Sequence, residues 1–175
     1  IFPADSRVSV NSSAAEFNRG DFLDRLTGTI DKTGTDPKRI ELELTESLLV
    51  DDLAAAAERI REIDRLGMRV AIDDFGTGYS SLSYLHELPL HTLKIDRRFT
   101  AGSPDDRAGA AATTIVSLAQ DLGFIAVAEG LEYEHQRSFL ERSGCELAQG
   151  FLFAPPLPKA TFERYLVEQH PATAI

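Results

Sequence analysis

The most chemically informative residues of this sequence are the adjacent carboxylates Asp73 and Asp74, which follow the apolar residues 70–72 and open a glycine-bearing turn at residues 75–81. Removing an ionised carboxylate from water costs several kcal/mol, so such a pair needs compensation where a buried strand meets a loop. A metal ion, a basic partner or full exposure to water would each provide it. The choice among these three determines what chemistry the pair can do.

Polar side chains recur where other strand-like runs end. The runs that we interpret as strands are residues 7–11, 40–45, 69–73, 92–96, 124–129 and 147–151. Besides the aspartate pair, the polar residues in or near the C-terminal halves of these runs are Asn11, Glu43, Lys94, Asp96, Glu129 and Gln149. Because the carboxyl ends of parallel strands meet at the same place in a barrel, one site could hold them all.

The donor types in this set favour a particular kind of metal. Oxygen ligands without cysteine or histidine suit hard cations such as Mg²⁺ or Mn²⁺. A bridging carboxylate at Asp73 beside a second one at Asp74 permits two ions about 4 Å apart, an arrangement used for in-line phosphoryl displacement. Lys94, held among carboxylates, could orient or deprotonate a water molecule, or neutralise a phosphate.

Each of these groups also has an ordinary structural interpretation. The glutamates of residues 41–46 fit a solvated strand edge, and Lys94 with Asp96 fits an ion pair. The aspartate pair 73–74 fits a capped turn, since aspartate favours such positions. These interpretations are independent of one another, whereas a single shared site explains all of the residues together.

Segments with apolar residues at helical spacing separate the strands. The clearest is residues 53–66, with Asp51 or Asp52 as its expected N-cap and Gly67 as its end. A second segment ends with residues 115–122, a third includes residues 139–140, and the last includes residues 162–166. Alternating strands and helices indicate a parallel α/β protein. About six such units are present, where a closed (β/α) barrel has eight in about 250 residues.

The pattern within the strands distinguishes a barrel from an open sheet. In four successive strands the apolar pairs 8/10, 42/44, 70/72 and 93/95 share one face, and polar or small residues occupy the other. A doubly wound sheet is apolar on both faces and usually carries a G-x-G-x-x-G turn, which is absent here. We therefore predict an α/β fold, a (β/α)8 TIM-like barrel that lacks about two N-terminal β/α units.

Composition narrows the function classes. The 175 residues suit one domain, residues 1–175, and the net charge of −10 argues against a nucleic acid polymer as partner. Bound cations would still let an acidic site accept a small phosphate ligand. The single cysteine, Cys145, excludes an internal disulfide, so we expect a cytoplasmic location. No apolar stretch approaches the roughly 20 residues of a membrane span, and Ile1 is interpreted as a cut within a longer gene product.

Six motifs together resemble one known family. They are V-N-S-S (10–13), E-L-T-E-S (43–47), D-D-F-G-T-G-Y-S-S-L (73–82), L-K-I-D (93–96), A-E-G-L-E (128–132) and Q-G-F-L-F (149–153), the last followed by P-P-L-P (155–158). In this order and over nearly the whole chain, they resemble EAL domains, bacterial phosphodiesterases that hydrolyse the second messenger cyclic di-GMP. The resemblance implies water attack on one phosphodiester bond, assisted by two Mg²⁺ or Mn²⁺ ions, which opens the ring to linear pGpG.

The resemblance also implies roles for single residues. The positions that match family metal ligands are Asn11, Glu43, Asp73, Asp74 and Glu129, with Asp73 as the bridge. Lys94 matches the lysine that contacts the attacking water, and Glu46 matches a glutamate that steadies the loop after Asp74. Glu132 matches a residue that supports catalysis, whereas Gln149 and Asp96 are expected on the substrate side.

The main departure from the family pattern is the E-A-L motif itself, which is absent from the 175 residues. In the family it lies upstream of V-N-L-S and supplies a further metal ligand, so we expect it in a preceding segment. Ser12 also replaces the usual leucine. Two alternatives to an active enzyme follow: a cyclic di-GMP receptor without activity, or an inactive fragment. The resemblance further implies a homodimer and flanking sensory or GGDEF-type domains in a longer protein that could be membrane-anchored.

Overall fold

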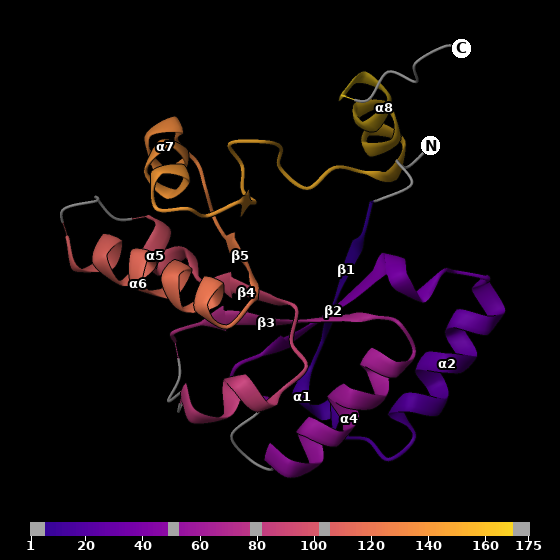
Figure 1. The fold of residues 1–175 in the computed structure, drawn as a ribbon. Coiled ribbons are helices and arrows are strands. Elements are labelled where there is room, and N and C mark those ends of the chain that lie inside the picture. Colours follow the sequence, from indigo (N-terminus) through magenta and orange to yellow (C-terminus); the bar gives the residue numbers. More distant parts are fainter. Residues whose placement is uncertain (1–5, 49–52, 78–81, 102–105, 170–175) are drawn as a thin grey trace.

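The computed structural model describes residues 6–48, 53–77, 82–101 and 106–169. Its centre is a parallel sheet of six strands in sequential order, which curls as a barrel wall does (Figure 1). The strands are β1 (Val8–Ser12), β2 (Ile40–Thr45), β3 (Arg69–Phe75), β4 (Thr92–Ile95), β5 (Ile125–Ala128) and β6 (Leu147–Ala148). The predicted class is therefore confirmed: these strands form the wall of an incomplete TIM-like barrel.

The helices lie around the outside of this sheet, except the last one, which stands apart from it (Figure 1). They are α1 (Ala14–Phe17), α2 (Phe22–Thr33), α4 (Leu53–Arg65), α5 (Arg97–Thr100), α6 (Arg107–Asp121), α7 (Glu134–Arg142) and α8 (Lys159–Gln169), with 3-10 turns η1 (Pro37–Arg39) and η2 (Leu82–Glu87). The sequence analysis located four of the helices but did not single out α2. The expected N-cap at Asp51 or Asp52 falls outside the described residues.

The apolar strand face packs against the helices, as the alternation predicts. Leu44, Ile72 and Ile95 are fully buried in the core between sheet and helices. The prediction is wrong for β1, where Val8 and Val10 are 47% and 44% exposed. The reason is that β1 is an edge strand that pairs only with β2.

The last strand is shorter than the predicted run of residues 147–151. Only Leu147 and Ala148 pair with β5. Gly150 then adopts a φ of 155°, and a Cβ on it would lie 2.2 Å from the carbonyl oxygen of Leu131. The chain therefore leaves the sheet where its backbone presses against the loop that follows β5. Alternation in the sequence does not record that contact.

Ser12 at the end of β1 is buried, and its hydroxyl has no hydrogen-bond partner among the described residues. A buried hydroxyl without a partner is unfavourable by about 1–3 kcal/mol. The replacement of the family's leucine therefore costs more than one apolar contact.

None of the described helices has the length and hydrophobicity that crossing a membrane requires.

His91, which directly precedes β4, should make the stability of the fold depend on pH. Its Nδ1 accepts the Val70 N–H at 3.2 Å, and its Nε2 lies 3.4 Å from Asp64. Burial, and secondarily the nearby charge of Arg69, lowers the pKa of His91 below its usual 6.5. Protonation therefore favours the unfolded chain, so the free energy of unfolding should fall as the pH drops below about 6.5.

This expectation is tested by chemical denaturation between pH 8 and pH 5.5. In His91→Asn the amide oxygen can accept the same N–H without titrating, so the pH dependence in this window should flatten. An unchanged slope in the variant would assign the pH dependence to other groups.

Candidate metal-dependent active site

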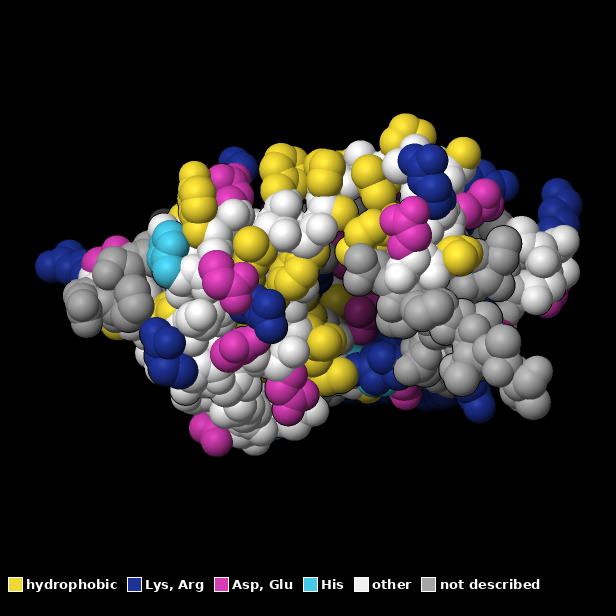
Figure 2. All heavy atoms as spheres, turned by 90° about the horizontal axis from the view of Figure 1, so that it is seen from above, with side chains coloured by type: hydrophobic (Ala, Val, Ile, Leu, Met, Phe, Trp, Pro, Cys, Tyr) yellow, Lys and Arg dark blue, Asp and Glu magenta, His cyan; other side chains and the backbone are white. Residues whose placement is uncertain are grey.

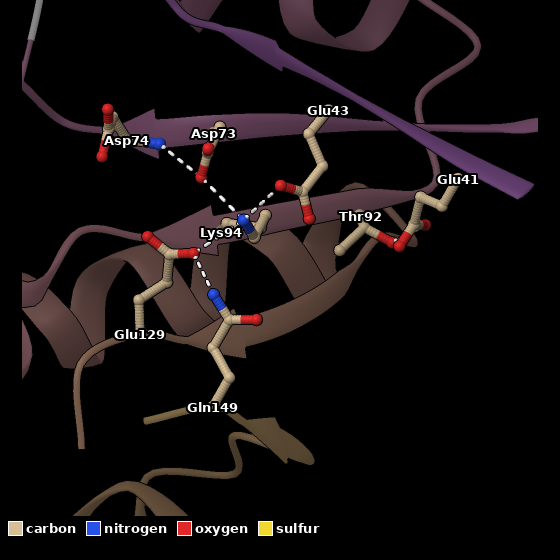
Figure 3. A network of polar contacts seen from close by, with 8 residues as sticks. All are labelled: Glu41, Glu43, Asp73, Asp74, Thr92, Lys94, Glu129 and Gln149. Carbon is tan, nitrogen blue, oxygen red and sulfur yellow. Dashed lines mark hydrogen bonds and ion pairs between the residues drawn. The ribbon is translucent and has the colours of Figure 1, made fainter. Parts of the chain in front are cut away.

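Lys94 occupies the centre of a carboxylate cluster inside the curled sheet. Its ammonium nitrogen lies 2.8 Å from Glu43, 2.9 Å from Asp73 and 2.7 Å from Glu129, and its side chain is only 5% exposed (Figure 3). Three acceptors match the three N–H donors of an ammonium group. The interior of the sheet thus holds one positive and three negative charges at hydrogen-bonding distance.

These four residues come from four neighbouring strands. Glu43 lies on β2, Asp73 on β3 and Lys94 on β4, while Glu129 directly follows β5. Their side chains point inward because strand residues alternate between faces, and the parallel order places all four toward the carboxyl ends. The sequence prediction that these strand ends converge is therefore correct for this group.

Burial and ion pairing shift the pKa values of Lys94 and Glu129 in opposite directions. Burial works against the ammonium form of Lys94, but the hydrogen bonds that it donates to Glu129, Glu43 and Asp73 raise the pKa of the lysine well above its usual value. Burial raises the pKa of Glu129, although Lys94 opposes that shift. Carboxylates held this close together attract a cation to the remaining oxygen lone pairs.

Asp74 takes its place through an irregularity in β3. The pairing of β3 with β4 shifts register between Ile72 and Phe75, and Asp74 has a φ of 53°, the left-handed region that non-glycine residues rarely adopt. Its backbone N–H donates to the Asp73 carboxylate at 3.1 Å. This bulge re-aims Asp74, so that oxygens of Asp73, Asp74 and Glu129 come within 4.8 Å of one another.

Asn11 and Gln149 flank the cluster from the two edge strands. Asn11 on β1 pairs in register with Glu43 and is exposed. Gln149, just after β6, donates from its amide nitrogen to Glu129 at 2.6 Å (Figure 3). Gln149 therefore contacts the cluster from one edge of the barrel wall, and Asn11 lies on the strand at the other edge.

Asp96 and Glu132 differ in how closely they join this site. Asp96 follows β4 and caps α5, with its carboxylate close to that of Asp74. Burial raises the pKa of Asp74, and the contact with Asp96 adds to the shift. Glu132 is exposed, and among the described contacts its carboxylate does not reach Lys94 or the other acidic groups. The structure brings Asp96 into the cluster and leaves Glu132 at its margin.

Glu46 is buried beneath the turn that follows Asp74. Its carboxylate accepts the N–H of Gly76 at 2.9 Å, and its own N–H donates to the backbone oxygen of Asp73 at 3.3 Å. Gly76 itself has a φ of 90°, and a Cβ on it would lie 2.8 Å from the Phe99 ring, so the turn requires glycine here. Glu46 therefore fastens the turn to β2.

Replacing Glu46 should separate a structural contact from a charge effect. Glu46→Ala leaves the Gly76 N–H without its acceptor, so we expect the free energy of unfolding to fall by about 1–3 kcal/mol. Glu46→Gln keeps an oxygen acceptor and should lose clearly less. Denaturant titration of both variants measures the difference, and equal losses would show that the negative charge, not the hydrogen bond, is what matters.

Two residues near the site were missed by sequence reasoning. Thr100 on α5 is fully buried and donates its hydroxyl to the backbone oxygen of Glu129, which ties that helix to the end of β5. Arg98 donates to Asp96 from both its backbone and its side chain. Thr100 shows no signal in the sequence, because its contact depends on how α5 packs over the end of β5. The Arg98 contact is local, and Asp96 as an N-cap is a signal that could have indicated it.

The donor set fits the divalent ions expected from the sequence. The available atoms are carboxylate oxygens and an amide oxygen, which magnesium and manganese prefer, and no histidine or cysteine takes part in the cluster described above. Asp73 and Asp74 are adjacent and share the cluster with Glu129. An acidic, partly buried site of this kind suits metal-assisted chemistry on an anionic substrate.

Comparison with known proteins agrees with this chemistry. A family model described as EAL domain matches residues 2–156. The chain belongs to the EAL domain family. The cyclic di-GMP phosphodiesterase NbdA of Pseudomonas aeruginosa is 43% identical over 164 residues, which cover 91% of this chain and 21% of NbdA. The chain spans about a fifth of the length of the curated relatives it matches first.

Solved EAL-domain structures share the fold described above. The PaMucR phosphodiesterase in its cyclic di-GMP complex has a TM-score of 0.87 and 39% identity, over 91% of this chain and 65% of that one. Klebsiella pneumoniae BlrP1, solved with manganese and cyclic di-GMP, has a TM-score of 0.78 and 28% identity, over 87% of this chain and 40% of that one. The expected resemblance to EAL domains is therefore confirmed.

Proposed function

We propose that this EAL domain hydrolyses cyclic di-GMP to linear pGpG. The observation that carries the proposal is the cluster of Glu43, Asp73 and Glu129 around Lys94, with Asp74 beside it. Every motif position for the chemistry that the chain contains is occupied by the residue type the reaction requires. NbdA and PaMucR, both named as phosphodiesterases, support the choice of substrate.

We propose Mg²⁺ or Mn²⁺ as the resident ions, two in number. The residues that would hold them are Asn11, Glu43, Asp73, Asp74 and Glu129. When bound, such ions neutralise the attacked phosphate and lower the pKa of a bound water. BlrP1 was solved with manganese, which supports this class of ion.

The chain's own residues would position the reactants. Lys94 is held among three carboxylates, so its positive charge can oppose the charge that develops on phosphate. Bound ions would compete with Lys94 for these carboxylates, which would free one of its N–H groups to orient the attacking water. The water oxygen forms a bond to phosphorus while the bond to the 3′ oxygen breaks, leaving a 5′-phosphate and a free 3′-hydroxyl. Gln149, in contact with Glu129, stands where it can contact the nucleotide.

A groove beside Gln149 offers room for the nucleotide. It has a volume of about 390 Å³ and is lined mainly by apolar and aromatic side chains, among them Phe151, Phe162 and Tyr165. Seen from above, hydrophobic side chains gather on this face of the molecule (Figure 2). Aromatic rings suit the flat faces of guanine bases, so the groove supports a nucleotide substrate.

The wider setting of the domain also stays a proposal. We propose that residues 1–175 form one partial EAL domain, with the E-A-L glutamate on a preceding segment, in a cytoplasmic homodimer with sensory or GGDEF-type neighbours. We also keep Glu46 and Glu132 as supporting residues, and Asp96 on the substrate side. The alternatives are a receptor that binds cyclic di-GMP without cleaving it, and an inactive fragment.

The test is release of pGpG from cyclic di-GMP by the full chain, followed by chromatography. We expect pGpG to form with Mg²⁺ or Mn²⁺ and to stop when a chelator removes the ions. Binding of cyclic di-GMP with no product in any of these conditions would favour the receptor, and neither binding nor product would favour the inactive fragment.

A further inference from the structure

Two side-chain contacts inside the barrel wall join β2 to β4, which are not neighbours in the sheet. Lys94 lies 2.8 Å from Glu43, and the Thr92 hydroxyl donates to Glu41 at 2.6 Å (Figure 3). Strand β3 runs between β2 and β4. Since neighbouring strands lie about 4.8 Å apart, each contact spans roughly 9 to 10 Å of sheet. Both contacts therefore pass over β3, whose side chains must leave room for them.

Ala71 is the residue of β3 that lies between the two contacts. It pairs in register with Glu43 on one side and with Thr92 on the other. Its neighbours Val70 and Ile72 pack in the hydrophobic core against the helices, so alternation turns the Ala71 methyl group toward the barrel interior. A side chain at this position therefore points into the space that the two contacts cross.

Polar side chains, and not the hydrophobic core, cover Ala71. It is fully buried, yet among the buried apolar residues that the structure describes it is the one that does not pack in that core. The interior residues beside it, Glu43, Thr92 and Lys94, are each at most 5% exposed. The methyl group is thus enclosed by the same side chains that form the site.

We propose that Ala71 is a positioning residue of the site, because its small side chain lets Lys94 reach across β3 to Glu43. Valine would add two methyl groups to this space while still suiting a strand. The added volume would push the Lys94 ammonium group away from Glu43. The consequence for hydrolysis rests on the proposed function, whereas the limit on side-chain size at position 71 depends on neither metal nor substrate.

A matched control is needed because extra methyl groups destabilise any well-packed interior. Ala126 on β5 is 6% exposed and packs in the hydrophobic core against the helices. It pairs in register with Leu93, whose side chain shares that core and points away from the barrel interior. Ala126→Val should therefore crowd the core without displacing Lys94.

The first experiment is a double-mutant cycle, measured by thermal unfolding of the full chain in chelator. Ala71→Val should lower the melting temperature when Lys94 is present. In Lys94→Ala the valine can fill the space that the lysine leaves, so its effect should shrink to less than about half or reverse. Ala126→Val should lower the melting temperature equally in both backgrounds.

Two substitutes keep the cycle decisive if a variant does not fold. Ala71→Cys adds one atom instead of two and replaces Ala71→Val in both backgrounds. If Lys94→Ala is unfolded in chelator, all members of the cycle are measured with Mn²⁺ instead.

The second experiment is steady-state hydrolysis of cyclic di-GMP. Ala71→Val should lower kcat by about 10- to 100-fold and change KM less, because a small misplacement of a catalytic group has an effect of this size. Ala126→Val should keep the wild-type kcat per folded molecule. A merely structural role of Ala71 would instead give the two valine variants the same kinetics.

Equal losses of melting temperature from Ala71→Val in the two backgrounds would overturn the proposal, because the valine would then not compete with Lys94 for space. Wild-type kcat in folded Ala71→Val would also overturn the positioning role. Absence of hydrolysis by the wild-type chain would overturn the proposed function, while the melting temperatures would still decide whether position 71 limits the reach of Lys94.

Discussion

Lys94→Ala should lower the rate of cyclic di-GMP hydrolysis by at least about 100- to 1,000-fold, the usual effect of removing one preorganised electrostatic group from an active site. The reason is geometric: three carboxylates fix the ammonium group at 2.7 to 2.9 Å, so no other described side chain can take its position. Metal affinity should change only modestly, because lysine is not a ligand. Steady-state kinetics and Mn²⁺ titration on the same preparation measure both quantities.

The same variant should make stability depend on metal. Without Lys94, the buried Glu43 lacks its positive partner, and breaking a buried ion pair costs about 3–5 kcal/mol. The melting temperature should therefore fall in chelator and recover when Mn²⁺ is added. Lys38→Ala, at an exposed lysine in η1, is the control and should change neither quantity. Wild-type turnover in Lys94→Ala would show that the proposed role of Lys94 is wrong.

Asp73→Asn should abolish binding of both ions and with it hydrolysis, by more than about 100-fold. The Asp73 carboxylate already accepts from Lys94 and from the Asp74 N–H through the same oxygen. An asparagine oxygen can keep these contacts, so the fold should survive. The amide nevertheless lacks the second oxygen and the negative charge that a bridging ligand needs. Metal analysis of the purified protein gives the stoichiometry.

Asp74→Asn provides a comparison for the number of ions that Asp73→Asn binds. Asp74→Asn should remove one ion and leave the other, because Asp74 is not expected to bridge. Asp24→Asn on the exposed face of α2 should leave both ions bound. Two ions per chain in Asp73→Asn would contradict the bridging role of Asp73, even if activity were lost.

The general fold could be predicted from alternation because that pattern reports directly on burial. Leu42, Leu44, Val70 and Ile72 are buried as expected, and their polar neighbours point into the barrel interior. The edge strand β1 could not be predicted in the same way, because exposure depends on neighbours that the pattern does not describe. The early end of β6 likewise results from the backbone contact at Gly150, which is tertiary.

The site was predictable to the same extent. Parallel strand ends bring Glu43, Asp73, Lys94 and Glu129 together, so residue types and strand assignment were sufficient for the central cluster. The left-handed backbone of Asp74 accompanies the register shift between β3 and β4. It does not follow from residue type, since aspartates before loops are common.

The most direct test of the proposed site is hydrolysis of cyclic di-GMP by the full chain in water enriched in ¹⁸O, with Mn²⁺ present. If the carboxylate cluster directs a water to phosphorus, the product is pGpG with one ¹⁸O atom in its 5′-phosphate, and none forms after chelation. Recovery of unlabelled, intact cyclic di-GMP from a chain that binds both Mn²⁺ and the nucleotide would contradict the enzyme and leave a receptor.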